Sequence, residues 1–225
     1  MKAPANAVDF PKAPPGNHPG YLTKIIDLGT TFNEMYSKDV HKVCFVYELT
    51  TCLKEPNDEG KQYPFQVTEF LTLSMNEKAN LRKRVESWLG RAFDNDEEAE
   101  NYDIVDKWDP EGNPNGLLGR PGLIGVIHAK KKNGDIREQV TVVMSPPTGV
   151  DVPKRLTPLL KFDLSEFDKE TFEKLGQGYQ RMIKDSKQYR ALYGNDEPTD
   201  QSVTQANASA PSPHVDDDFD DDIPF

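Results

Sequence analysis

The sequence predicts a mainly β fold, on the strength of three observations. Segments 40–51 and 136–145 are rich in β-branched and aromatic residues, and the Asn-Gly pair at 133–134 favours a tight hairpin. The clearest helical segment, 74–90, falls between the third and fourth of five expected strands. Three strands, a helix and two strands is the element order of the five-stranded OB-fold barrel. We therefore expect an OB-type barrel, followed by short C-terminal helices and a disordered acidic tail.

The first three strands are expected to form a meander after a Pro-rich arm, residues 1–19. They span 21–33, 40–51 and 63–74, and the turn-forming segment 54–62 precedes the third. The second strand carries apolar residues at every second position, which predicts one face packed on the core: Val43, Phe45, Tyr47 and Leu49.

The helix at 74–90 has recognisable ends. Ser74 followed by Glu77 is the pattern of a capping box, and Gly90 is a typical helix stop. Its apolar residues recur at helical spacing, which predicts one buried stripe: Leu81, Val85, Trp88 and Leu89. A second short helix is expected in the acidic segment 94–108.

The second half of the chain begins with a hairpin of strands 123–132 and 136–145. Segment 146–162 has no regular hydrophobic pattern and is expected to be a loop. Segment 163–193 predicts two short helices, broken near Gly176, that pack on the barrel. The core domain is therefore expected to span residues 20–193.

The charge is distributed unevenly along the chain. There are 27 basic and 38 acidic residues, for a net charge of -11. Segments 94–111 and 194–225 hold nine acidic residues each, and without them 26 basic residues face 20 acidic ones, a net charge of +6. The net charge of the whole chain therefore does not exclude nucleic acid as a partner of the core.

Other chemistry has little support in the sequence. No apolar run is long enough for a membrane span, and the first residues lack the apolar stretch of a signal peptide. Cys44 and Cys52 fit a reduced, cytoplasmic protein, although a disulfide between them stays open. The four histidines show no metal-ligand spacing and no phosphate-binding loop is present. We expect no catalytic residue, no cofactor, no metal and no membrane partner.

The chain ends in VDDDFDDDIPF (215–225), which combines six aspartates with an apolar end. It follows segment 194–214, which has no Phe, Tyr or Trp and is expected to be a disordered linker. A tail that only keeps the protein soluble does not need the apolar end. A partner protein can bind such a peptide with an apolar pocket for Phe225 and basic residues for the carboxylates.

The stretch DFDDDIPF resembles the C-terminal peptide of bacterial single-stranded DNA-binding proteins. That family uses this peptide to recruit replication, recombination and repair enzymes. The resemblance implies that the following residues bind partners: Asp218, Phe219, Asp220, Asp221, Asp222, Ile223, Pro224 and Phe225. The core lacks that family's N-terminal strand pattern, so only the tail residues are carried over. In segments 70–93 and 122–143 the core is similar instead to phage-encoded replication-module proteins.

Non-specific binding of single strands needs cationic side chains for the phosphates and aromatic faces for the bases. OB barrels present both on strands two and three and on nearby loops. The DNA contacts predicted on this basis are Tyr21, Lys24, Lys42, Tyr47, Tyr63, Phe70, Lys130, Lys131, Lys132 and Arg137. Some of these have a competing structural interpretation. Tyr47 shares a face with Val43 and Leu49, which is typical of core, whereas Phe70 has polar neighbours on its face and is the aromatic most expected to be exposed.

The sequence therefore predicts a non-enzymatic, phage-encoded single-stranded DNA-binding protein that acts in the bacterial cytoplasm. It leaves open whether the chain forms a homo-oligomer and whether the acidic tail competes with DNA for the core. A second hypothesis is an interaction mimic that displays the host tail peptide without binding DNA. A third, weaker one is a metal-dependent nuclease that uses the acidic residues of 94–111.

Overall fold

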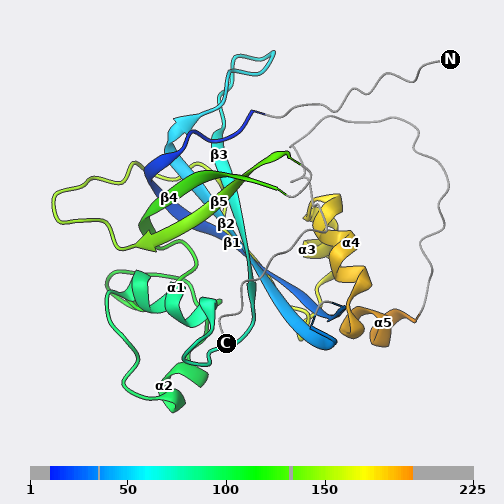
Figure 1. Ribbon diagram of the computed structural model, residues 1–225. Helices are drawn as coiled ribbons and strands as arrows, with labels where there is room; N and C mark the ends of the chain where they lie inside the picture. The colour runs from blue at the N-terminus through cyan, green and yellow to red at the C-terminus, as the bar shows by residue number, and fades with distance from the viewer. Residues whose placement is uncertain (1–10, 35, 132–133, 195–225) are drawn as a thin grey trace, which may run out of the picture.

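The fold is organised around one antiparallel sheet (Figure 1). The computed structural model describes residues 11–34, 36–131 and 134–194. Lys132, the linker residues from 195 and the acidic tip 215–225 lie outside them. The elements are β1 (Gly16–Asn33), β2 (Lys38–Leu53), β3 (Pro64–Thr72), α1 (Asn80–Leu89), α2 (Asp96–Glu100), β4 (Pro121–Lys130), β5 (Ile136–Met144), β6 (Leu160–Phe162), α3 (Lys169–Lys174), α4 (Gln177–Asp185) and α5 (Lys187–Tyr193).

The sheet order is β3-β2-β1-β4-β5, and β6 pairs in parallel with β1. β1 is the longest strand, because it pairs with β2 along most of its length and with β4 through residues 16–21. The change of neighbour occurs at Gly20, where a Cβ atom would lie 2.1 Å from the backbone oxygen of Glu48. No side chain fits there, and glycine allows β1 to cross close to β2.

The two edge strands, β3 and β5, share no strand ladder in the described residues, so the sheet is not closed into a barrel. Arg84 on α1 nevertheless connects them. Its Nε donates to both carboxylate oxygens of Glu69 on β3 (3.1 and 3.0 Å), and its Nη1 lies 3.4 Å from the carbonyl oxygen of Thr141 on β5. The prediction of a mainly β fold is confirmed, while the expected closure is not observed.

Two hydrophobic clusters use opposite faces of β1 and β2. We call the face that packs against α1 the inner face; its cluster includes Leu22, Ile25, Phe45, Tyr47, Val85, Trp88 and Ile124. The opposite, outer face packs against β6 and α3–α5; its cluster includes Ile26, Leu28, Cys44, Val46, Phe162, Phe172, Tyr179 and Ile183. The predicted inward alternation along β2 is confirmed, but the residues between are buried as well, because helices cover the second face (Figure 1).

Helix α1 begins later than the sequence predicts. Its N-cap is Ala79 and makes no side-chain cap, so the predicted capping box at Ser74 is wrong. The Ser74 hydroxyl instead accepts the backbone N–H of Asn76 at 3.3 Å, and such local bonds compete with helix formation. The predicted stop is confirmed, since Gly90 caps the helix in the left-handed region with φ 73°.

The remaining differences concern short elements. The C-terminal segment forms three helices, with the break before α4 at Gly176, and β6 lies where a loop was expected. β1 begins at Gly16, inside the predicted N-terminal arm. In the described parts of the chain, every helix is too short or too polar to span a bilayer.

Candidate nucleic-acid interface

The outer face of β2 and β3, where the OB fold would place DNA, is covered by the segment after β5. Residues 150–157, which we call the strap, cross this face. The backbone N–H groups of Leu156 and Thr157 donate to the carboxylate of Glu48 at 2.7 and 2.6 Å, and Glu48 is fully buried on β2. Gln66 on β3 donates to the Thr157 hydroxyl at 3.0 Å. The strap is therefore fixed to both strands by hydrogen bonds.

Helix α4 covers the same face beside the strap. The hydroxyl of Tyr179 lies 3.4 Å from that of Thr68 on β3, and burial is the main cause that raises the pKa of Tyr179. Phe70, the aromatic most expected to be exposed, is half-buried against this cluster. The prediction that Phe70 offers an open stacking surface is wrong, because this cluster covers part of its side chain. The sequence of β3 does not indicate that a helix lies on this face.

Tyr47 is a core residue, so its assignment to the DNA surface is also wrong. It is fully buried on the inner face, and its ring centroid lies 5.8 Å from that of Trp88. Its hydroxyl donates to Glu69 at 2.7 Å. Burial, and next the nearby Glu69 carboxylate, raise the pKa of this phenol. The alternation with Val43 and Leu49 indicated this position correctly.

Three other predicted contacts are partly covered. Lys42 is buried, with 9% of its surface exposed, and Lys24 is half-buried on β1. Burial lowers the pKa of Lys24. The half-buried Tyr21 points to the strap, where its hydroxyl lies 3.4 Å from the carbonyl oxygen of Val152. These three positions are therefore poor candidates for the main DNA contacts.

The other predicted contacts that the structure describes gather at one end of the sheet. There the β2–β3 connection, residues 11–15 and the β4–β5 hairpin converge. Nε2 of His128 lies 2.8 Å from the carbonyl oxygen of Ala13, and the Ala13 N–H donates to Glu138 on β5. Lys12 and Lys54 both act on the pKa of Glu138. We call this region the basic end and define it by Lys12, Lys54, Lys61, Tyr63, Lys130, Lys131 and Arg137.

Two aromatic side chains at the basic end carry an ammonium group beside the ring. Lys61 Nζ lies 5.0 Å from the centroid of Tyr63, and Lys54 Nζ lies 5.6 Å from that of Phe65. The two lysines are held near each other, because the Lys54 N–H donates to the Tyr63 carbonyl at 2.8 Å. Tyr63 is 46% exposed, so its ring offers a face to a base while a cation stands next to it.

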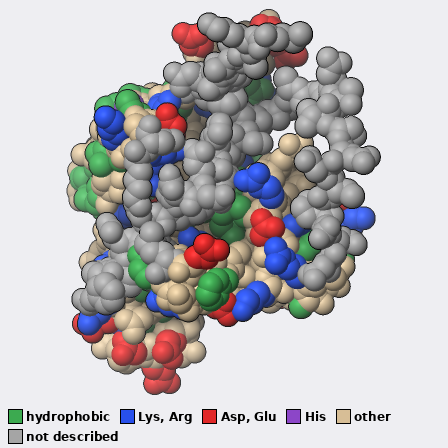
Figure 2. All heavy atoms as spheres, turned by 45° about the vertical axis from the view of Figure 1, so that its right-hand side comes forward, with side chains coloured by type: hydrophobic (Ala, Val, Ile, Leu, Met, Phe, Trp, Pro, Cys, Tyr) green, Lys and Arg blue, Asp and Glu red, His purple; other side chains and the backbone are tan. Residues whose placement is uncertain are grey.

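Acidic side chains oppose this charge. The β2–β3 connection also carries Glu55, Asp58 and Glu59, all exposed, so it is not positive as a whole. Glu138 lies within the basic end, and burial raises the pKa of its carboxyl group. Figure 2 brings forward the side that carries α3–α5, and there Lys/Arg and Asp/Glu side chains are intermixed. The visible part of that side has no continuous basic band.

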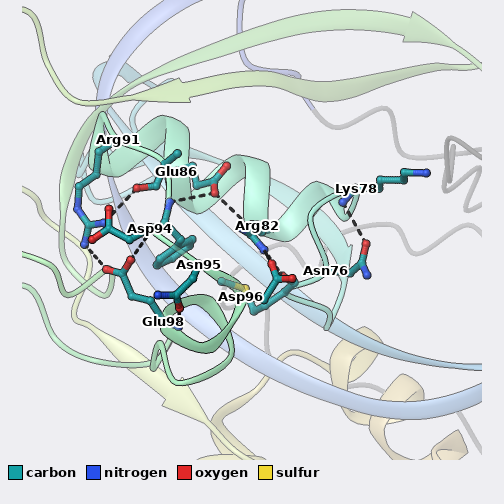
Figure 3. A network of polar contacts seen from close by, with 12 residues as sticks. Asn76, Lys78, Arg82, Glu86, Arg91, Asp94, Asn95, Asp96 and Glu98 are labelled. Carbon is teal, nitrogen blue, oxygen red and sulfur yellow. Dashed lines mark hydrogen bonds and ion pairs between the residues drawn. The ribbon is translucent and has the colours of Figure 1, made fainter.

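The acidic segment 94–111 lies with α1 and α2, away from the β2–β3 connection (Figure 1). Figure 3 shows its first residues beside α1. Its first carboxylates fold the segment onto α1. Arg82 donates to Glu86 at 3.0 Å and to Asp96 at 2.5 Å, and Arg91 pairs with Glu98 at 2.7 Å. Ion pairing and turn formation therefore explain these carboxylates without a ligand.

Later aspartates of the acidic segment accept hydrogen bonds within their own loop. Asp103 accepts the N–H of Val105 at 2.9 Å, and Asp109 accepts the N–H of Glu111 at 3.0 Å. Over the described ranges, no group of three His, Cys, Asp or Glu side chains is arranged to hold a metal ion.

Sequence reasoning missed Lys12, Lys54 and Lys61. The closeness of Lys61 and Tyr63 in the sequence, just before β3, was a usable signal for a lysine beside an aromatic ring. Lys12 carried no such signal, because its place depends on how residues 11–15 return to β5.

A comparison with models of known protein families finds no match to this chain, and no curated protein matches it significantly.

Proposed function

We propose that this protein binds single-stranded DNA without strong sequence preference through the basic end, and that its acidic tip recruits replication, recombination and repair enzymes. The observation that carries the proposal is the stretch DFDDDIPF at 218–225, preceded by a polar segment that contains no Phe, Tyr or Trp. An apolar end next to clustered aspartates suits capture by a partner with an apolar pocket and a basic rim. Its site of action would be the bacterial cytoplasm.

The arrangement of the strands supports an OB-type core. The order of three strands, helix and two strands, together with antiparallel pairing of β1 and β4, agrees with that fold, which is often only partly closed. Arg84 links the edges at the place where closure would occur. We therefore propose that the sheet is an open variant of the OB fold.

The covered outer face supports a DNA site elsewhere on the molecule. The strap and α4 occupy the surface of β2 and β3, so DNA would bind instead at the basic end, where the exposed Lys61 stands beside the exposed Tyr63. Lysines there would contact phosphates, and Tyr63 would stack on a base at about 1–3 kcal/mol. The nearby acids limit the affinity most at low salt, where their repulsion of the phosphates is least screened.

Fluorescence anisotropy with a labelled oligo-dT tests the proposal. Four to six phosphate contacts give a slope of log K against log salt of about -3 to -4 for a single strand. Duplex competitor should displace the oligonucleotide poorly. A chain without residues 215–225 should bind at least as tightly, because six aspartates no longer compete with the phosphates. If neither form binds at low salt, the proposed DNA function is wrong.

A second candidate is the interaction mimic, and the acids of the β2–β3 connection favour it, since they weaken any positive field at the basic end. In that case the acidic tip alone carries the function. The mimic would be established if the full-length protein binds a host enzyme that recognises the C-terminal peptide of bacterial single-stranded DNA-binding proteins but does not bind oligo-dT. Loss of enzyme binding on Phe225→Ala, with oligo-dT binding intact, would establish the two-part protein.

A further inference from the structure

A cysteine and a histidine meet where β1 leaves β2. Beyond residue 49 of β2 the ladder with β1 ends, and side chains rather than backbone groups span the gap. The hydroxyl of Thr50 donates to the carbonyl oxygen of Pro19 at 3.0 Å. Two residues later, Sγ of Cys52 lies 3.1 Å from Nδ1 of His18.

The contact of the other ring nitrogen of His18 shows which of the two nitrogens carries the hydrogen. Nε2 of His18 lies 2.8 Å from the carbonyl oxygen of Pro14. A carbonyl can only accept, so Nε2 carries the hydrogen and, in the neutral ring, Nδ1 presents its lone pair to the thiol. The Cys52 thiol is therefore the donor. A nucleophile, a base and a group that orients the base stand in line, which is the usual arrangement of an activated nucleophile.

The base matters because burial disfavours the thiolate, which is the reactive form. Burial raises the pKa of Cys52, and a bond from Thr51 only partly opposes it. At neutral pH the resting group is thus the thiol, and reaction needs a partner that takes its proton. Cys44 provides a comparison within the same chain, since it is fully buried on the outer face and burial raises its pKa strongly.

We propose that Cys52 is a thiol-modification site, activated by His18, that reacts with small disulfides. As the sulfur attacks one sulfur of the disulfide, its proton passes to Nδ1 of His18. A new S–S bond forms to Cys52, the original S–S bond breaks, and the other half leaves as a thiolate. The disulfide is the oxidant, and Cys52 and one half of the reagent end as a mixed disulfide.

The site lies beside the basic end, because Cys52 is two residues from Lys54. The inference is nevertheless separate from DNA binding, since the reaction is read on the thiol itself.

The test is the reaction of native, full-length protein with DTNB, an aryl disulfide whose released thiolate is coloured. We expect one thiol per chain to react, peptide mapping to locate it at Cys52, and the second to react only in guanidinium chloride. Cys52→Ser should abolish the native reaction. The wild-type protein alone can overturn the proposal. It does so if both native cysteines react equally fast with DTNB, or if Cys52 does not react.

The role of His18 is tested with His18→Gln, which cannot take the proton. An ordinary thiol, with a pKa of about 8.5, is only a few per cent thiolate at neutral pH, so we expect the rate to fall by about tenfold. His128→Gln is the matched control, since His128 bonds a backbone carbonyl at the same end of the sheet. An unchanged rate in His18→Gln, with the circular dichroism spectrum unchanged, would show that the pair is only structural.

Discussion

Replacing Glu48 tests whether its buried carboxylate holds the strap on the outer face. Glu48 is fully buried, and it accepts the backbone N–H groups of Leu156 and Thr157. In Glu48→Ala both donors lose their partner. In Glu48→Gln one acceptor oxygen remains, and the amide N–H₂ faces the second donor.

The magnitude follows from the two hydrogen bonds. A hydrogen bond to a charged group contributes about 1.5–3 kcal/mol to stability, so the pair contributes about 3–6 kcal/mol. Alanine also removes the cost of burying the carboxylate, which moves the expected loss toward the lower end, about 3 kcal/mol. We expect Glu48→Gln to lose about half as much.

The assay is guanidinium chloride unfolding, combined with hydrogen exchange at the amides of Leu156 and Thr157. Both amides should lose protection in Glu48→Ala, and the free energy of unfolding should fall as stated. Glu170→Ala is the control, because Glu170 forms an exposed ion pair with Lys174 and should change stability by less than about 1 kcal/mol. If Glu48→Ala loses no more than this control, the carboxylate does not anchor the strap.

Three further outcomes are expected. Tyr63→Ala should weaken oligo-dT binding by about fivefold or more, because one stacked base is lost. Tyr36→Ala is the control, since Tyr36 also lies beside a lysine but at the other end of β2, and it should not weaken binding. Equal losses in the two variants would show that Tyr63 is not part of the interface. Replacing Asp58 by Asn and Glu59 by Gln should strengthen binding by roughly threefold at low salt and leave it unchanged at high salt, and an unchanged low-salt affinity would place DNA elsewhere. Burial raises the pKa of Glu138, so the folded state holds this proton more tightly than the unfolded state, and stability is lost as pH rises from about 4.5 through the folded value. Thermal melts should therefore find Glu138→Gln more stable than wild type at pH 7 but not below about pH 4.5, and a less stable variant at pH 7 would contradict this.

Local patterns predicted the strands of the sheet and the central helix well. Alternation along β2 placed Phe45 and Tyr47 inside, and Gly90 marked the end of α1, because both signals depend on neighbours in the chain. The start of α1 was predicted six residues early, since Ser74 and Asn76 satisfy backbone groups in a turn as readily as in a helix.

The surface was predicted less well, because it depends on which segments cover the sheet. Cys44 and Val46 interrupt the polar side expected for β2, and a strand apolar on both sides indicates burial on both faces. That signal was available and pointed to a covered outer face. The convergence of Lys12 and Lys54 on Glu138 had no local signal, since it joins segments more than eighty residues apart.

The sharing of β1 and β2 between two hydrophobic clusters has a consequence for dissecting the protein. A fragment that stops after β5 would keep all five main strands, yet it would expose Ile26, Cys44 and Val46 to water. Those side chains would then form an exposed apolar patch in the middle of the sheet, which would favour aggregation. Residues 146–193 are therefore part of the folding unit, and the shortest fragment expected to stay monodisperse runs through α5.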